Sequence, residues 1–410
     1  MKTNITLIFL IVSSILFSQG SYNLASGNKC KVWCKYPGDS VQWDGKCKDG
    51  LAHGFGTAIW SEKGVEAERY SGEMLNGKSN GKGTLLFPDG RKLSGNFKDG
   101  EFLNLSKKAM KSINKIVLDI NDSTDLYISD GSSKELFYYL LIPEEKPIGV
   151  LVLLPAAWET VEHAISSTKV LCETALKNNI AVIYPSVNQH IVLNTENLFF
   201  MNSVFEHAVT NYDLPSGKFV LGGLSMGGHL SLRYAELSFD KEEQTFIQPI
   251  AVFNVDGPTD LENLYLIWEG NLLNLRNMNK DEGNYVISVL EKHTGGSPRD
   301  YHDQYLSYSI FSKSELNGGN AHFLKDIPVR IYNDVDVNWW ITNRGSDLYS
   351  MNALDQSAMI NFLNGIGNDK AEFINAFGKG YRIEGNRHPH SWSIVDPEEC
   401  LSWVLNCLNN

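Results

Sequence analysis

The pattern with the clearest chemical meaning is a serine held between glycines, Gly223-Leu224-Ser225-Met226-Gly227. An apolar run, Phe219 to Leu224, precedes it, and a stretch with helical spacing, Gly228 to Leu237, follows. A serine on such a strained strand-to-helix turn stands above the end of the strand, where it can attack a carbonyl carbon. The same turn aims the backbone N–H of Met226 at the oxyanion that forms. The pattern predicts Ser225 as a nucleophile and Met226 as an oxyanion donor.

The surrounding residues resemble a known superfamily. Asp213-Leu214-Pro215 and the segment Gly222 to Gly228 look like the esterase-D and prolyl-oligopeptidase-like branches of the α/β-hydrolases, and the resemblance extends over residues 136 to 408. It implies acyl transfer through a serine, with an acid and then a histidine following later in the chain. No cofactor is expected for this chemistry.

The acid is expected in a loop after an apolar strand. Residues 327 to 332 form such a run and lead into Asn333-Asp334-Val335-Asp336, which is similar to the family's loop with the acid three residues beyond a small turn residue. We therefore expect Asp336 to be the acid. Asp334 is a second candidate, and some relatives place the acid after the preceding strand, where this chain has Asp256 and Asp260.

The histidine is expected on the loop before the last helix. Residues 388 to 393 read His-Pro-His-Ser-Trp-Ser, similar to the family's His-Ser-Trp loop, and residues 396 to 399 open a helical stretch. This resemblance predicts His390 as the base, with His388 as the alternative.

The second oxyanion donor is expected after an earlier strand, in Leu153 to Thr160, which resembles the family's loop there. Alanines stand where many relatives carry glycine, so the donor is either Ala156 or Ala157, and we favour Ala157. Four tryptophans near the proposed catalytic groups predict an aromatic substrate pocket, although they could also only pack loops onto the domain: Trp158, Trp339, Trp340 and Trp392. The insertion between residues 260 and 324 has helical spacing and is expected to cap this pocket.

The elements that must position these residues follow from an alternation of apolar runs and amphipathic stretches. The strands are expected at 137–142, 149–154, 180–184, 219–224, 250–255, 329–332 and 371–376, with helices including 160–176, 196–210, 228–237 and 347–363. Strands that are apolar on both faces and separated by helices indicate a mostly parallel sheet covered on both sides. The fold class is therefore α/β, with the catalytic domain at residues 131–410.

An internal repeat occupies the amino-terminal third. Glycines at 45, 50, 54 and 56 recur with the same spacings at 72, 77, 81 and 83, and Trp43 and Tyr70 stand two places before the two sets. Such a pattern predicts stacked β-hairpins that share an aromatic core. Residues 41–102 resemble MORN repeats, which implies contact with lipid or protein, although the module could equally serve only as a packed spacer. Residues 103–130 are interpreted as a connector.

The amino terminus predicts export. Lys2 precedes an apolar run, Ile5 to Phe17, that ends in Ser18-Gln19-Gly20, which is typical of a signal peptide over residues 1–20. The mature protein is then expected to be secreted or periplasmic, where disulfides are permitted. Among Cys30, Cys34 and Cys47 we expect one pair, while the zinc ligands that such a group would need are not found.

The composition narrows the range of substrates and partners. A net charge of −12 without a basic cluster disfavours nucleic acid as a partner. We expect a carboxylesterase-like serine hydrolase that acts on a small-molecule ester, with a peptide substrate as the alternative because Gly295-Gly296-Ser297-Pro298 resembles prolyl-oligopeptidase-like chains. Those peptidases usually carry a propeller, for which this chain has no room. A non-catalytic binding protein on the same fold is the third hypothesis.

Overall fold

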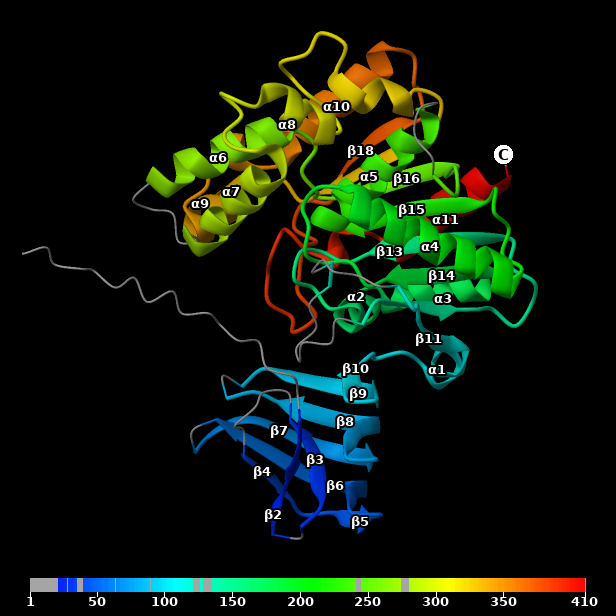
Figure 1. The fold of residues 1–410 in the computed structure, drawn as a ribbon, viewed down its shortest axis with the longest axis vertical. Helices are drawn as coiled ribbons and strands as arrows, with labels where there is room; N and C mark the ends of the chain where they lie inside the picture. Colours follow the sequence, from blue (N-terminus) through cyan, green and yellow to red (C-terminus); the bar gives the residue numbers. More distant parts are fainter. Residues whose placement is uncertain are drawn as a thin grey trace, which may run out of the picture.

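The computed structural model describes residues 21–27, 29–34, 40–62, 64–88, 90–120, 126–127, 135–240, 245–273 and 280–409. It contains a strand-rich module and a larger α/β domain (Figure 1). The expected signal peptide lies outside the described residues. Within the described ranges, no helix has both the length and the apolar character needed to span a membrane.

The module is a ten-stranded sheet built mainly from antiparallel hairpins. Its central strands are β6 (Leu51–Glu62), β7 (Val65–Leu75), β8 (Lys78–Leu86), β9 (Lys92–Lys98) and β10 (Glu101–Phe102). The remaining strands lie toward the β6 side: β1 (Ser21–Leu24), β2 (Ser26–Gly27), β3 (Lys31–Cys34), β4 (Ser40–Trp43) and β5 (Lys46–Lys48). The first strand of the sheet therefore begins at Ser21, whereas the repeat pattern starts at residue 41.

The repeated glycines form one row across four neighbouring strands. Gly56 pairs with Gly72, Gly72 with Gly83, and Gly83 with Gly95. A Cβ at Gly83 would stand 2.3 Å from the ring of Tyr70, which is only 1% exposed. The glycines thus leave room for the aromatic core that the repeat predicted. A disulfide joins Cys30 to Cys47, which is one of the pairs expected.

The larger sheet has eight strands in the order β11-β12-β14-β13-β15-β16-β17-β18. β12 is antiparallel to both of its neighbours, and the pairings from β14 through β18 are all parallel. The strand bounds are β11 (Ile113–Val117), β12 (Phe137–Leu141), β13 (Gly149–Leu154), β14 (Ile180–Pro185), β15 (Phe219–Leu224), β16 (Ala251–Val255), β17 (Val329–Asn333) and β18 (Ala371–Asn375). The expected α/β class with a mostly parallel sheet is confirmed.

Helices cover both faces of this sheet. Every residue of β13, β14 and β15 is buried although successive side chains point to opposite faces, so neither face meets solvent there. The helices that flank the sheet are α2 (Val161–Ser167), α3 (Lys169–Lys177), α4 (Thr195–Tyr212), α5 (Met226–Phe239), α10 (Ala353–Gly365) and α11 (Pro397–Asn409). The single helix expected over 160–176 is two helices that meet at Thr168.

The insertion after residue 260 forms three helices, α6 (Leu261–Leu273), α7 (Lys280–Thr294) and α8 (His302–Tyr308). They share a small apolar core of their own that includes Tyr265, Leu290 and Tyr305. Figure 1 shows α6 and α7 side by side, with α9 (Val337–Arg344) next to them. The helical cap expected from the sequence is therefore present.

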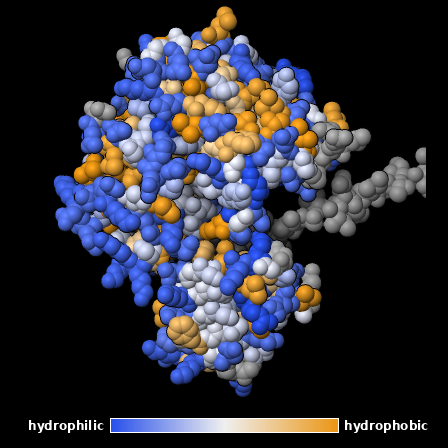
Figure 2. Space-filling view, turned by 180° about the vertical axis from the view of Figure 1, so that it is seen from behind, coloured by the Kyte–Doolittle hydropathy of each residue, from blue (hydrophilic) through white to orange (hydrophobic). Residues whose placement is uncertain are grey.

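The two bodies are linked by the connector and also contact each other directly. Leu103 and Leu105 are buried in the core of the α/β domain, and α1 (Lys107–Ser112) leads into β11. The Ser166 hydroxyl of α2 donates to the Phe102 carbonyl of the module. Figure 2, from the opposite side, shows the larger body above the smaller one across a narrow waist, with mostly hydrophilic side chains on this face.

Candidate active site

Ser225 occupies a sharp turn between β15 and α5. Its φ of 57° and ψ of −121° are unusual for a residue with a side chain, and its N–H donates to the Val255 carbonyl at 2.8 Å. A Cβ on Gly223 would lie 2.2 Å from the Gly227 backbone, and one on Gly227 would lie 2.3 Å from the Leu154 carbonyl oxygen. Only glycine fits at both places, which explains the spacing seen in the sequence.

The turn opens into a pocket of about 180 Å³. Ser225 and His390 both line it, so the structure brings the expected nucleophile and the expected base to one cavity. The capping helices supply much of the apolar wall, through Leu264, Ile267, Trp268, Tyr285 and Val286. A substrate at Ser225 would therefore lie between the sheet edge and the cap.

His390 pairs with Asp256 and not with Asp336. The Nδ1 atom of His390 lies 2.6 Å from Oδ2 of Asp256, whose side chain is only 7% exposed. The second carboxylate oxygen accepts from the Asn333 amide at 2.6 Å. A carboxylate at Nδ1 holds the proton there and leaves Nε2 free to accept one, which is the arrangement that a general base needs.

Asp336, the acid expected from the sequence, has a different task. Its carboxylate caps the amino terminus of α9 by accepting from the Trp339 N–H at 3.0 Å, and it pairs with Arg387 at 2.9 Å. Asp334 also pairs with Arg387, and it accepts from the backbone N–H of Gly380. Both aspartates are engaged with Arg387 and with backbone N–H groups, and His390 contacts Asp256 in place of Asp336, the acid that the sequence predicted.

Asp260, the remaining candidate acid, forms hydrogen bonds where the cap begins. Its carboxylate accepts from the backbone N–H groups of Asn263 and Lys313. Burial raises its pKa to about 6, although those two hydrogen bonds act in the opposite direction. It has no contact with His390 among the described contacts.

The order of strands explains why Asp256 is the partner. β16 lies directly beside β15, with Val255 opposite Leu224, so the residues that follow them emerge next to each other. β17 lies one strand further away, with Tyr332 opposite Val255. Asp336 is the N-cap residue of α9, and its carboxylate is engaged by the first turn of that helix and by Arg387.

The two expected oxyanion donors border the same pocket. Met226 is the first residue of α5, where backbone N–H groups have no acceptor within the helix. Ala157 lies in the loop after β13 and also lines the pocket. The N–H of Ala156 already donates to the Glu159 carboxylate at 2.8 Å, which leaves Ala157 as the better of the two alanine candidates.

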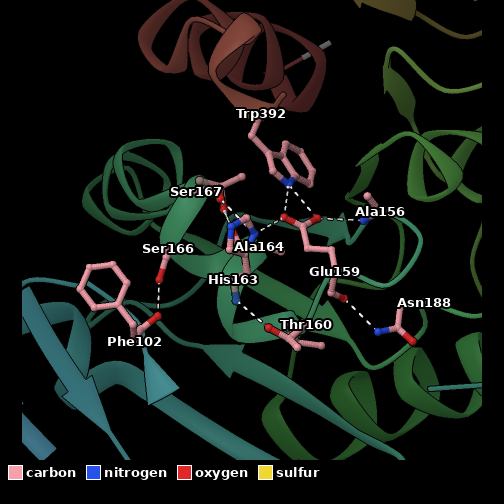
Figure 3. Close-up of polar contacts among 12 residues, drawn as sticks. Phe102, Ala156, Glu159, Thr160, His163, Ala164, Ser166, Ser167, Asn188 and Trp392 are labelled. Atoms are coloured by element: carbon pink, nitrogen blue, oxygen red, sulfur yellow. Dashed lines mark hydrogen bonds and ion pairs between the residues drawn. The ribbon is translucent and has the colours of Figure 1, made fainter. Parts of the chain in front are cut away.

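Glu159 connects the loop after β13 to the loop that carries His390 (Figure 3). Its side chain is 6% exposed and contacts His163 Nδ1 at 2.7 Å, and it also accepts from Ala156 and from the Trp392 indole N–H. Burial alone would raise the pKa of Glu159, but these hydrogen bonds outweigh it and the pKa lies below its usual value. Glu159 was missed in the sequence because no motif marks it.

Of the four tryptophans expected in the pocket, Trp158 and Trp340 line it. Trp392 is 4% exposed and donates to Glu159, and the ring of Trp339 lies tilted against that of His388. Trp268 of the cap, which was not expected, also lines the pocket. Trp392 and Trp339 therefore support loops, which is the packing alternative considered for them.

His388, the alternative base, also lines the pocket but has a different environment. Arg344 Nη2 lies 3.0 Å from its Nε2, where the guanidinium donates and the imidazole accepts. Burial, followed by the positive charge of Arg382, lowers the pKa of His388 to about 2. No carboxylate orients it in the way that Asp256 orients His390.

A known protein family matches the amino-terminal module. Residues 44–65 and 70–90 match the MORN repeat family, so the resemblance of the amino-terminal module is confirmed. No curated protein sequence matches the chain.

Solved structures with a similar fold include several esterases. A truncated carbohydrate esterase from gut microbiota is 15% identical, over 75% of this chain and 99% of that one, with a TM-score of 0.49. Carboxyl esterase 2 from the fungus Tuber melanosporum is 12% identical, over 75% and 87%, with a TM-score of 0.47. An S-formylglutathione hydrolase from Agrobacterium tumefaciens is 10% identical, over 72% and 95%, with a TM-score of 0.43.

Proposed function

We propose that the protein is an exported serine hydrolase that cleaves carboxylic esters, with Ser225 as nucleophile, His390 as base and Asp256 as acid. The observation that carries the proposal is the contact of 2.6 Å between His390 and Asp256 in the pocket that Ser225 borders. Export is proposed from the apolar run of residues 5 to 17, and the Cys30–Cys47 disulfide fits an oxidising compartment.

In the proposed reaction, Ser225 Oγ forms a bond to the ester carbonyl carbon while His390 Nε2 takes its proton. The N–H groups of Met226 and Ala157 stabilise the negative oxygen of the tetrahedral intermediate. His390 then returns the proton to the departing alkoxide, which leaves as the alcohol. Water, deprotonated by the same histidine, releases the acid and restores the serine, while Asp256 stabilises the imidazolium in both steps.

A fluorophosphonate probe tests the nucleophile directly. The purified protein is expected to be labelled at Ser225, and Ser225→Ala is expected to lose both labelling and hydrolysis of 4-nitrophenyl acetate, a loss on the order of 10⁶ in rate. Ser203→Ala is the matched control, because the Ser203 hydroxyl donates to the Phe199 carbonyl within α4 and does not line the pocket. A folded wild-type protein that is neither labelled nor active would favour a non-catalytic binding protein.

Export is tested by the amino terminus of the mature chain. Expression with residues 1–20 present is expected to release a protein outside the cytoplasm whose sequence starts after that segment. A cytoplasmic protein that keeps these residues would contradict export without touching the catalytic proposal.

A further inference from the structure

The pocket beside Ser225 contains two guanidinium groups, those of Arg344 and Arg382. Arg344 is already engaged, since Nη1 lies 3.5 Å from the Glu282 carboxylate and Nη2 contacts His388. Arg382 is half-buried on the segment between β18 and His390. In the part of the chain that the structure describes, no carboxylate lies within ion-pair distance of it.

Three carboxylates lie near Arg382, and each has another partner. Glu159 binds His163, Glu282 lies against Arg344, and Glu384 is 3.9 Å from Arg91 of the module. Burial lowers the pKa of Arg382, and the positive charge of Arg344 lowers it too, whereas these carboxylates raise it. The guanidinium nevertheless remains protonated at neutral pH. One positive charge therefore faces the pocket without a direct counter-ion, which is costly for a partly buried group.

The other residues that line the pocket restrict the kind of molecule that can carry the anionic group. Ile267, Trp268, Tyr285 and Val286 of the cap give the pocket apolar lining in addition to its catalytic polar groups. A small organic ester with one anionic group fits both features. A guanidinium presents paired N–H donors whose geometry matches a carboxylate.

We propose that the site prefers esters that also carry a carboxylate, with Arg382 as the residue that binds this carboxylate. This inference rests on the proposed function. The carboxylate can belong to the acyl part or to the alcohol part of the ester, because Arg382 and Ser225 border one common cavity.

Two pairs of matched esters separate these sources. The acyl pair is mono-4-nitrophenyl glutarate and 4-nitrophenyl pentanoate, and the alcohol pair is 4-acetoxybenzoate and its methyl ester. We expect kcat/KM to favour the anionic member of one pair by about tenfold or more, as a charge-assisted hydrogen bond would give. Arg382→Gln is expected to remove this preference, and Arg382→Lys to keep part of it.

Lys379→Gln is the matched control, because it removes a positive charge from an exposed position on the same segment that does not line the pocket. It is expected to leave the preference unchanged. A preference near one in both pairs, or an equal loss on both members in Arg382→Gln, would overturn the proposal.

A binding measurement separates this outcome from failure of the hydrolase proposal. In the Ser225→Ala background, calorimetry with both pairs is expected to show tighter binding of the anionic member of at least one pair, and the added Arg382→Gln change is expected to abolish the difference. Equal binding within both pairs would refute the role of Arg382 even in a protein without activity. If the anionic ester binds more tightly but the wild type hydrolyses neither ester, the proposed hydrolase activity is refuted and the role of Arg382 is not.

Discussion

Glycines have different structural roles in the β module and in the α/β domain. In the module, Gly56 and Gly83 leave room for the rings of Trp43 and Tyr70. In the α/β domain, Gly223 and Gly227 leave room for neighbouring backbone, which cannot move without displacing a strand or helix.

The difference teaches which substitutions should affect folding and which should affect chemistry. A ring displaced in one hairpin disturbs a packing unit that recurs along the module, far from Ser225. A displaced backbone at the elbow changes the position of the reacting oxygen itself. Substitutions at the elbow and in the module test this division, and a substitution of Asp256 tests the assignment of the acid.

The largest effect is expected at the acid. Asp256→Asn keeps the shape but places the wrong tautomer of His390 against Ser225, a change that costs about 10⁴ in turnover in serine proteases. Asp336→Asn is the matched control and is expected to lose about tenfold or less, since it weakens a helix cap. Both are measured on 4-nitrophenyl acetate. The reverse ranking would return the acid to Asp336.

Acid is expected to destabilise the α/β domain through its buried histidines. Burial lowers the pKa of His229 to about 4, so on acidification from about pH 6.5 the unfolded chain gains a proton that the folded domain does not. This costs roughly 3 kcal/mol by pH 4, at 1.4 kcal/mol per pKa unit. Burial also lowers the pKa of His293 to about 4 and that of His388 to about 2, which adds to this loss. The raised pKa values of His163, Glu236 and Asp260 act in the opposite direction.

Thermal unfolding followed from pH 7 to pH 4 measures this effect. The transition of the α/β domain is expected to move to lower temperature, because the histidines with a lowered pKa, His229, His293 and His388, all belong to that domain. An unfolding temperature that stays constant or rises over this range would contradict the expected destabilisation.

A glycine-to-alanine substitution in each body adds one methyl group and compares the two roles of glycine. Gly227→Ala pushes against the Leu154 carbonyl and should displace Ser225, and misplacement by about 1 Å costs on the order of 10² in rate. Gly83→Ala pushes against Tyr70 and is expected to lower the unfolding temperature of the module while sparing hydrolysis. If Gly83→Ala reduced activity as strongly as Gly227→Ala, the two bodies would not be separable in function.

The smallest effect is expected at Glu159. Glu159→Gln keeps the size but removes the charge that holds His163, Ala156 and Trp392, so kcat should fall about tenfold with KM little changed. Glu173→Gln is the control. The Glu173 carboxylate accepts from the Ser106 N–H at the connector and does not line the pocket. Equal losses in the two variants would mean that Glu159 acts only through stability.

Much of the fold could be predicted because its signals are local. The apolar runs at 149–154 and 219–224 coincide with β13 and β15, and the glycine spacing identified the hairpins of the module. The helix expected over 160–176 is broken because Thr168 caps the first segment and begins the second, which periodicity does not reveal.

The sequence by itself determined Ser225 and His390 as candidates, because the elbow needs glycines at fixed positions and the histidine loop has a recognisable form. It also placed an aspartate after each of two strands, and nothing local distinguishes those aspartates. Only the tertiary structure shows which of them contacts His390: Asp256 follows β16, which lies beside β15, whereas the carboxylates after β17 contact Arg387 and the start of α9. The same holds for Arg382, whose unpaired charge arises from the packing of segments far apart in the chain.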